Sequence, residues 1–110
     1  MAGQPRTWVV DFDSDAVLDF EDVKSRGDRK AVFNVVRKLK DLGPDLPSPH
    51  MKSLKGEVDL FELRPKQGAC VVRPIYARVG HRFVVLAAAS KKRNFDRAVA
   101  EARIRLSQHR

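Results

Sequence analysis

The feature that most limits the fold is an unbroken apolar run, Phe83–Ala89, with the sequence FVVLAAA. The run is far shorter than the roughly 20 residues that a membrane-spanning helix needs. A strand that is apolar on both faces is expected at the centre of a sheet, where both faces are covered. The run therefore predicts a central strand with other elements packed on each side.

Further strands are predicted around this run. Val58–Arg64 and Cys70–Ala77 alternate in polarity, and the turns that follow them suit antiparallel hairpins. Thr7–Phe12 is a short β-branched and aromatic run that predicts a first strand. Pro44–Gly56 contains three prolines and no periodicity, so we expect an irregular connector there, neither helix nor strand.

Three helices are predicted between and after the strands. Asp13 or Ser14 caps a short helix that runs to about Val23 and buries Val17, Leu18 and Phe20. The second ends at Gly43-Pro44 and forms a helical hairpin with the first. Asn94 caps the last helix. The expected apolar faces are Val32, Val35, Val36, Leu39 and Leu42 on the second helix, and Phe95, Ala98, Val99, Ala102 and Leu106 on the last.

The predicted order is β-α-α-β-β-β-α. It indicates an α+β fold in which the helical hairpin and the C-terminal helix pack on a small, mainly antiparallel sheet. Neither a repeat nor a linker divides the chain, so residues 1–110 are expected to form a single domain.

The charge is large and unevenly placed. Lysine and arginine number 22 against 14 acids, which gives a net charge of +8. Residues 1–22 carry one base and six acids, a net of −5, while residues 23–110 carry 21 bases and eight acids, a net of +13. Such an excess attracts polyanions, so nucleic acid is the leading class of partner, against a basic surface that serves only solubility.

Cysteine and histidine indicate neither a metal site nor a disulfide. Cys70 is the only cysteine, and a small half-buried strand residue is favoured there over a nucleophile. The three histidines do not share metal-ligand spacing on one element, so no metal and no cofactor is expected. The start, Met1–Arg6, lacks a secretory pattern, and the chain is expected to be cytoplasmic, without a membrane partner.

Four motifs, in order, resemble those of RelE/HigB-type bacterial toxins. They are Leu42–Pro47 followed by Met51–Gly56, then Leu60–Arg64, then Val72–Tyr76, and finally Ser90-Lys91-Lys92. The resemblance runs from about residue 8 to residue 107 and is closer to the HigB-type branch, because Glu62 stands where the RelE branch tends to carry lysine. Two positions depart from the pattern: Pro74 replaces an aliphatic residue, and Leu86–Ser90 lacks an aromatic residue that is usual before the lysine pair.

The resemblance implies a toxin that cuts mRNA in the ribosomal A site without a metal ion. In this reaction the RNA 2′-hydroxyl attacks the adjacent phosphate and leaves a 2′,3′-cyclic phosphate, which requires a base, an acid and cations for the phosphorane. Carried over by position, Arg73 is the arginine that contacts the scissile phosphate, and Lys91 and Arg64 complete the expected catalytic set. An ion pair with Glu62 is an equal alternative for Arg64.

Other residues receive weaker assignments. Lys92, Arg93, Lys52 and Lys55 are expected to bind nucleic acid. Candidates for the acid or base are Glu62, Tyr76, His81 and His109. Against these roles, Glu62 is expected to hold Arg64, Tyr76 to lie in the core, and the histidines to be solvated.

Partners and alternatives follow from the same resemblance. The expected partners are the ribosome, mRNA and a cognate antitoxin, a helix-turn-helix protein like HigA that binds outside the catalytic face. A ParE-like inhibitor of DNA gyrase and a non-catalytic nucleic-acid-binding module remain as alternatives.

Overall fold

The structure is a computed structural model that describes residues 7–21, 23 and 25–110. The expectations for Met1–Arg6 and Asp22 lie outside the described residues. Five strands form one mixed sheet in the order β1-β5-β4-β3-β2, in which β1 runs parallel to β5 and the other pairs are antiparallel. The strands are β1 (Val9–Phe12), β2 (Met51–Ser53), β3 (Phe61–Leu63), β4 (Arg73–Val79) and β5 (Arg82–Ala89). The α+β class and the mainly antiparallel sheet are confirmed.

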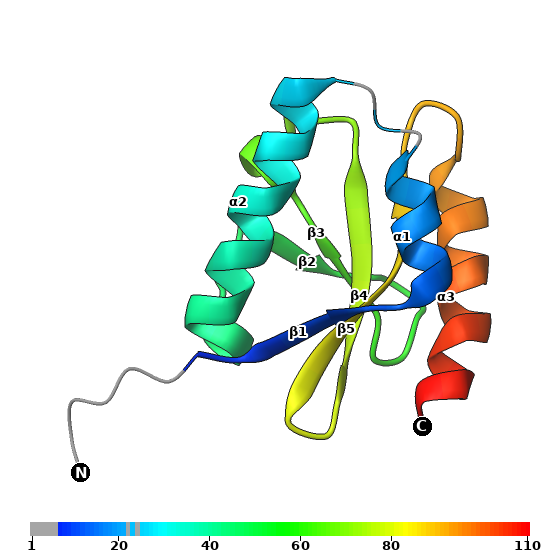
Figure 1. The fold of residues 1–110 in the computed structure, drawn as a ribbon. Helices are drawn as coiled ribbons and strands as arrows, with labels where there is room; N and C mark the ends of the chain where they lie inside the picture. The colour runs from blue at the N-terminus through cyan, green and yellow to red at the C-terminus, as the bar shows by residue number, and fades with distance from the viewer. Residues whose placement is uncertain (1–6, 22, 24) are drawn as a thin grey trace, which may run out of the picture.

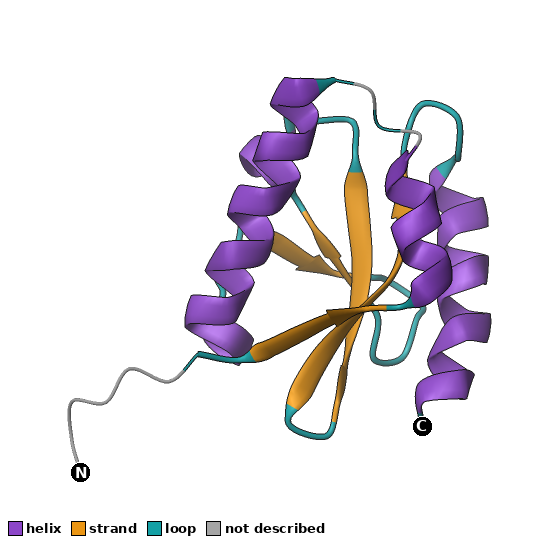
Figure 2. Ribbon diagram, in the orientation of Figure 1, coloured by secondary structure: helices purple, strands orange, loops and turns teal. Residues whose placement is uncertain are grey.

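Three α-helices and two 3-10 turns complete the fold. They are α1 (Ser14–Glu21), α2 (Arg26–Leu42), η1 (Gly43–Asp45), η2 (Pro65–Gly68) and α3 (Phe95–His109). Helix α2 covers one face of the sheet, while α3 covers the other, with α1 beside it (Figures 1 and 2). Among the described residues, no helix has the length and apolar character needed to cross a membrane.

The predicted helix boundaries are set by local hydrogen bonds. Asp13 accepts from the amides of Asp15 and Ala16 at 2.9 and 3.3 Å and so caps α1. Asn94 accepts from the Arg97 amide at 2.8 Å and caps α3. Helix α2 ends at Gly43, whose φ is 55°. A Cβ at Gly43 would lie 2.3 Å from the Trp8 indole, so that position excludes a side chain.

The core has two parts, one on each face of the sheet. On one face, the apolar stripe of α2 packs on residues of β3, β4 and β5, including Leu63, Tyr76 and Val85. On the other, Ala98, Val99, Ala102 and Leu106 of α3 pack on Ile75, Val84 and Leu86. Every residue of Phe83–Ala89 is buried, as expected for a central strand covered on both sides.

Helix α1 departs from its prediction. Val17 and Leu18 are 48% and 57% exposed, whereas Asp19 is only 4% exposed. The reason is that α1 turns a polar face to α3, where Asp19 meets Arg93 and Arg105 at 3.1 and 2.9 Å. Although α1 and α2 follow each other as predicted, they do not lie side by side, and a groove opens between them.

Smaller differences concern element ends and one missed strand. Met51–Ser53, inside the predicted connector, forms β2 and pairs with β3. This edge strand has three residues, too few for a visible alternation. Strands β3 and β4 begin later than predicted, at Phe61 and Arg73. Leu42 and Phe95, predicted in apolar faces, are 43% and 38% exposed because each lies at a helix end.

Candidate active site

Arg73 and the lysine pair meet at one end of the sheet. Arg73 opens β4 and lies opposite Ala89, the last residue of β5. Lys91 and Lys92 follow in a tight turn that is closed by the Ser90 amide donating to the Arg93 carbonyl at 2.8 Å. Both lysines are exposed. The structure thus brings together the predicted phosphate-binding arginine and the predicted basic pair.

A buried carboxylate lies beside this arginine. Glu62, on β3, is 4% exposed, and its Oε1 lies 3.7 Å from Arg73 Nη1 and 3.9 Å from Arg64 Nε. Its Oε2 is buried and has no hydrogen-bond partner among the described residues. At these distances Glu62 is a counter-ion shared by two arginines rather than the hydrogen-bonded partner of either one.

Lys52 and Lys55 extend the basic group across the neighbouring strand. Lys52 lies opposite Glu62 in the register of β2 and β3. Both lysines line a cleft of about 390 Å³, and the other lining residues include Glu62, Glu57, Phe95, Asp96 and Arg103. Glu62 is therefore buried but faces an open cleft, which is the setting that a base for an RNA hydroxyl requires.

Three of the four candidate proton-transfer residues lie elsewhere. Tyr76 is 2% exposed among Phe61 and Phe83, on the opposite face of the sheet, and burial raises its pKa. His81 lies in the β4–β5 turn, at the other end of both strands from Arg73. His109 ends α3, about 20 Å along that helix from its start near Arg73. These positions leave Glu62 as the candidate of the four that adjoins Arg73.

His109 and Arg93 have structural contacts instead. His109 Nε2 lies 2.8 Å from Asp13 Oδ2, where it joins the end of α3 to the cap of α1. The Arg93 side chain is 16% exposed and contacts Asp19 at 3.1 Å and Glu101 at 2.6 Å. Both contacts engage Arg93 inside the fold, and its role in binding nucleic acid stays a prediction.

Cys70 is buried, and desolvation raises the pKa of its thiol, which donates to Asp28 Oδ1 at 3.4 Å. It lies in the turn before β4 rather than in the strand. A buried, protonated thiol is a poor nucleophile. Within the described part of the chain, no group of three or more histidine, cysteine, aspartate or glutamate residues could hold a metal ion.

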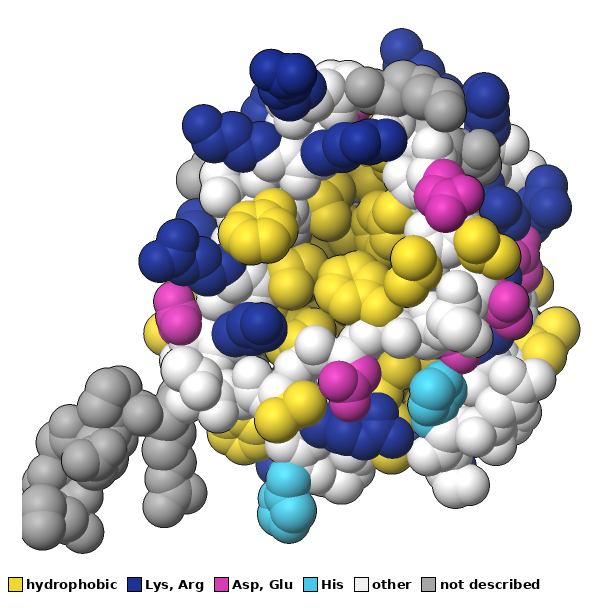
Figure 3. Space-filling view, viewed as in Figure 1, with side chains coloured by type: hydrophobic (Ala, Val, Ile, Leu, Met, Phe, Trp, Pro, Cys, Tyr) yellow, Lys and Arg dark blue, Asp and Glu magenta, His cyan; other side chains and the backbone are white. Residues whose placement is uncertain are grey.

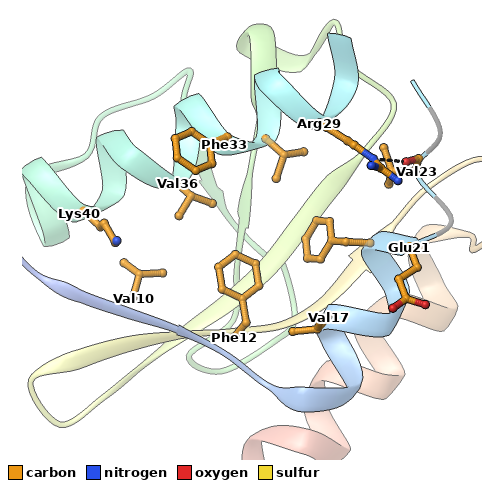
Figure 4. Close-up of a pocket in the computed structure, with 11 residues that line it drawn as sticks. Val10, Phe12, Val17, Glu21, Val23, Arg29, Phe33, Val36 and Lys40 are labelled. Atoms are coloured by element: carbon orange, nitrogen blue, oxygen red, sulfur yellow. Dashed lines mark hydrogen bonds between the residues drawn. The ribbon is translucent and has the colours of Figure 1, made fainter. Parts of the chain in front are cut away.

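An apolar groove of about 460 Å³ lies between α1 and α2. Figure 3 shows it as a hydrophobic hollow with Lys and Arg side chains around much of its rim. Val36 and Phe33 of α2 face Val10 and Phe12 of β1 across it, with Val17 of α1 at one end (Figure 4). Phe33 is 69% exposed. A large exposed side chain beside an apolar groove is typical of a surface that binds another molecule.

Two groups of residues that line these clefts were not expected from the sequence. Phe95 was placed in the core, yet it is the first residue of α3 and lines the Glu62 cleft. Lys30, Lys38 and Lys66 line a second cleft that Arg64 also borders. The sequence did hold a signal for the second group. Lys30, Asn34 and Lys38 are spaced four residues apart, and residues at this spacing share one face of a helix.

Comparisons with known proteins agree with this architecture. An E. coli toxin RelE, solved as an arginine double mutant in the free state, matches with a TM-score of 0.65 at 15% sequence identity. The match covers 91% of this chain and 98% of that one, and it shows a shared fold. None of the curated proteins matches the sequence. Residues 20–110 match the family described as phage-derived protein Gp49-like (DUF891). The chain therefore belongs to the Gp49-like family, a family of RelE/HigB-type toxins.

Proposed function

We propose that this protein is the toxin of a toxin–antitoxin pair and cuts mRNA on the ribosome as a metal-independent endoribonuclease. The observation that carries the proposal is Glu62 between Arg64 and Arg73, at 3.9 and 3.7 Å, in a cleft lined by Lys52 and Lys55. A carboxylate with several cations near it is what phosphate transesterification needs. Translation as the target implies that the protein acts in the cytoplasm.

Each step of the reaction has a group at this site. Glu62 accepts the proton of the 2′-hydroxyl, and the 2′-oxygen attacks the adjacent phosphorus. Arg73, with Lys91 beside it, balances the charge that develops on the phosphorane oxygens. The bond from phosphorus to the 5′-oxygen breaks, and a lysine ammonium such as that of Lys52 supplies the proton to that oxygen. The products are a 2′,3′-cyclic phosphate and a 5′-hydroxyl.

The test combines mapping of the cuts with analysis of the RNA ends. Purified protein is incubated with translating ribosomes, and the mRNA is mapped by primer extension with and without 1,10-phenanthroline, which removes transition metals while leaving ribosomal magnesium. We expect cuts within codons, cyclic phosphate ends and no effect of the chelator. Breaks in gyrase-bound DNA without mRNA cuts would favour a ParE-like toxin, and RNA binding without cuts would favour a non-catalytic module.

The proposed antitoxin partner is a helix-turn-helix protein like HigA that binds in the apolar groove between α1 and α2. The occupant we propose is a segment that is apolar on one side, with an acid near one end and a base near the other. Phe33, Phe12 and Val17 offer the apolar contacts, while Lys40 favours a carboxylate and Glu21 favours a base at the opposite end. None of the groove-lining residues belongs to the Glu62 cleft, so this partner would bind outside the catalytic face.

A further inference from the structure

A second cleft, between α2 and η2, is lined by positive side chains. Its volume is about 470 Å³, and its lining includes Lys30 and Lys38 of α2, Lys66 of η2, Arg64 at the end of β3, and His50. No carboxylate lines it among the described residues. Asp28, in the first turn of α2, instead accepts a hydrogen bond from Cys70 at 3.4 Å. A concave site with four cations and no acid concentrates anions.

The spacing of the cations fits a strand rather than a single ion. Lys30 and Lys38 are eight residues apart on one face of α2, which is about 12 Å along the helix. Asn34, midway between them, also lines the cleft. Lys66 reaches the first turn of α2, because its Nζ would lie 4.0 Å from a Cβ built at Gly27. Cations spread over this length can contact several phosphates in succession.

Arg64 connects this cleft to the candidate active site. Its Nε lies 3.9 Å from Glu62, its side chain also lines the cleft, and its amide donates to the His50 carbonyl at 2.9 Å. The Nε is buried and has no hydrogen-bond partner among the described residues. The side chain as a whole is 30% exposed and lines the cleft, so its guanidinium can meet a phosphate oxygen there.

We infer that this cleft binds the sugar–phosphate backbone of single-stranded RNA next to the segment that is cut. This inference rests on the proposed function, because that function makes RNA the polyanion that the protein meets. Arg64 holds the phosphate nearest the Glu62 cleft, and Lys66, Lys30 and Lys38 hold those further along. The cleft contributes affinity without base specificity, because its charged groups contact phosphates.

The test measures RNA binding without cleavage. The probe is a fluorescein-labelled 2′-O-methyl oligouridine, which has no 2′-hydroxyl to attack and stays intact. Its fluorescence anisotropy is titrated with wild-type protein, with Lys30→Ala/Lys38→Ala and with Arg37→Ala/Lys40→Ala at several KCl concentrations. The control pair lies on the same helix and removes the same charge, but lines a different cleft, which Trp8 also lines. All four side chains are exposed, so both variants should fold.

We expect Lys30→Ala/Lys38→Ala to bind the probe about tenfold more weakly than the control. Loss of two phosphate contacts should also lower the slope of log affinity against log salt by about 1.4. Equal affinities and slopes for the two variants would overturn the inference, as would an equal loss of binding to labelled polyglutamate, which would mark a general anion site. Because the probe cannot be cut, this assay measures binding alone. Its result can therefore be distinguished from a failure of the proposed cleavage activity.

Discussion

Glu62 is the residue on which the candidate active site depends. Its side chain is 5% exposed and lies between two arginines whose side chains are 30% and 33% exposed. Both distances exceed hydrogen-bond length, so the contacts of Glu62 with the two guanidinium groups are ion pairs without a hydrogen bond. Burying a charge is costly unless charges of opposite sign surround it, and the two arginines meet that need.

The first prediction concerns Arg73. Arg73→Ala should lower the rate of mRNA cleavage about 100-fold, because it removes one donor to the phosphorane. It should also remove growth arrest in cells that express the protein. Rates come from primer extension on ribosome-bound mRNA, and folding is checked by circular dichroism.

The matched control is Arg78→Ala. Arg78 lies on the same strand at the opposite end, where its guanidinium stacks 5.1 Å from the Trp8 ring centre. Full cleavage by this variant, with slow cleavage by Arg73→Ala, would place the effect at the Glu62 end of the sheet. Full growth arrest by a folded Arg73→Ala protein would exclude Arg73 as the phosphate contact.

Among the elements, α1 is held by charges more than by apolar packing. Asp19 contacts Arg93 and Arg105, and Glu101 bridges the same two arginines at 2.6 and 2.7 Å. Arg105 also donates to the Leu86 carbonyl at 2.8 Å. Leu86 is the extra residue of a bulge in β5, between the positions paired with Ile75 and Tyr76. The network thus joins α1, α3 and the irregular point of the sheet.

The second prediction tests this network. Asp19→Ala should lower the free energy of unfolding by about 3 kcal/mol, because it leaves two mostly buried guanidinium groups with one carboxylate between them. Urea unfolding measures the change. Asp15→Ala, an exposed acid in the first turn of the same helix, should cost less than about 1 kcal/mol. Equal losses for the two variants would show that the network adds nothing to stability.

The third prediction concerns the joint between α1 and the end of α3. Burial opposes ionisation of Asp13, but hydrogen bonds from His109 and from the Asp15 and Ala16 amides outweigh it and lower the pKa of Asp13. A carboxyl whose pKa is lower in the folded state stabilises the fold above its unfolded pKa, and this contribution is lost as pH falls through the folded value.

Asp13→Asn keeps a capping oxygen and removes the charge. The Tm of the wild type should therefore fall more than the Tm of the variant between about pH 5 and pH 2. Thermal unfolding followed by circular dichroism at both pH values gives the comparison. Parallel decreases in the two proteins would mean that Asp13 is not the group responsible.

The elements also show what the sequence could predict. The apolar stripe of helix α2 and its end at Gly43 were predicted well because both are local signals. The buried face of α1 was predicted wrongly. A helix of eight residues shows too little periodicity to define its buried face, and Asp19 is buried by Arg93 and Arg105, which lie 74 and 86 positions away in the sequence. Strand β2 was missed for a related reason: it forms by pairing with β3, and the local sequence of three residues does not reveal that pairing.

The candidate site was predictable only in part. Resemblance to known toxins pointed to Arg73 and Lys91, and the strand register does place them at one end of the sheet. The sequence could not place Phe95 beside Glu62, since that requires knowing how α3 crosses the sheet. It also could not separate His109, which binds Asp13, from a histidine at the site.

Across the whole molecule, the acidic start of the chain neutralises part of the basic remainder within the fold. Asp11 contacts Arg82, Asp13 contacts His109, and Asp19 contacts two arginines. These acids therefore have partners within the fold. The cleft bordered by Arg64, Lys30, Lys38 and Lys66 carries part of the remaining positive charge, and the apolar groove shares no lining residue with it or with the Glu62 cleft.

The separation of these surfaces leads to a prediction about the antitoxin. The partner tested is the product of the neighbouring reading frame, co-expressed with this protein and purified as a complex. Phe33→Ser should weaken its binding well beyond tenfold, roughly 1.4 kcal/mol, because Phe33 is a large exposed side chain over the groove. Ile104→Ser is the matched control, since Ile104 is 64% exposed on α3, outside the groove.

Arg73→Ala/Lys91→Ala should bind the antitoxin with unchanged affinity. Kd values come from isothermal titration calorimetry. A large loss in the Arg73→Ala/Lys91→Ala variant, with none in Phe33→Ser, would show instead that the antitoxin covers the catalytic face.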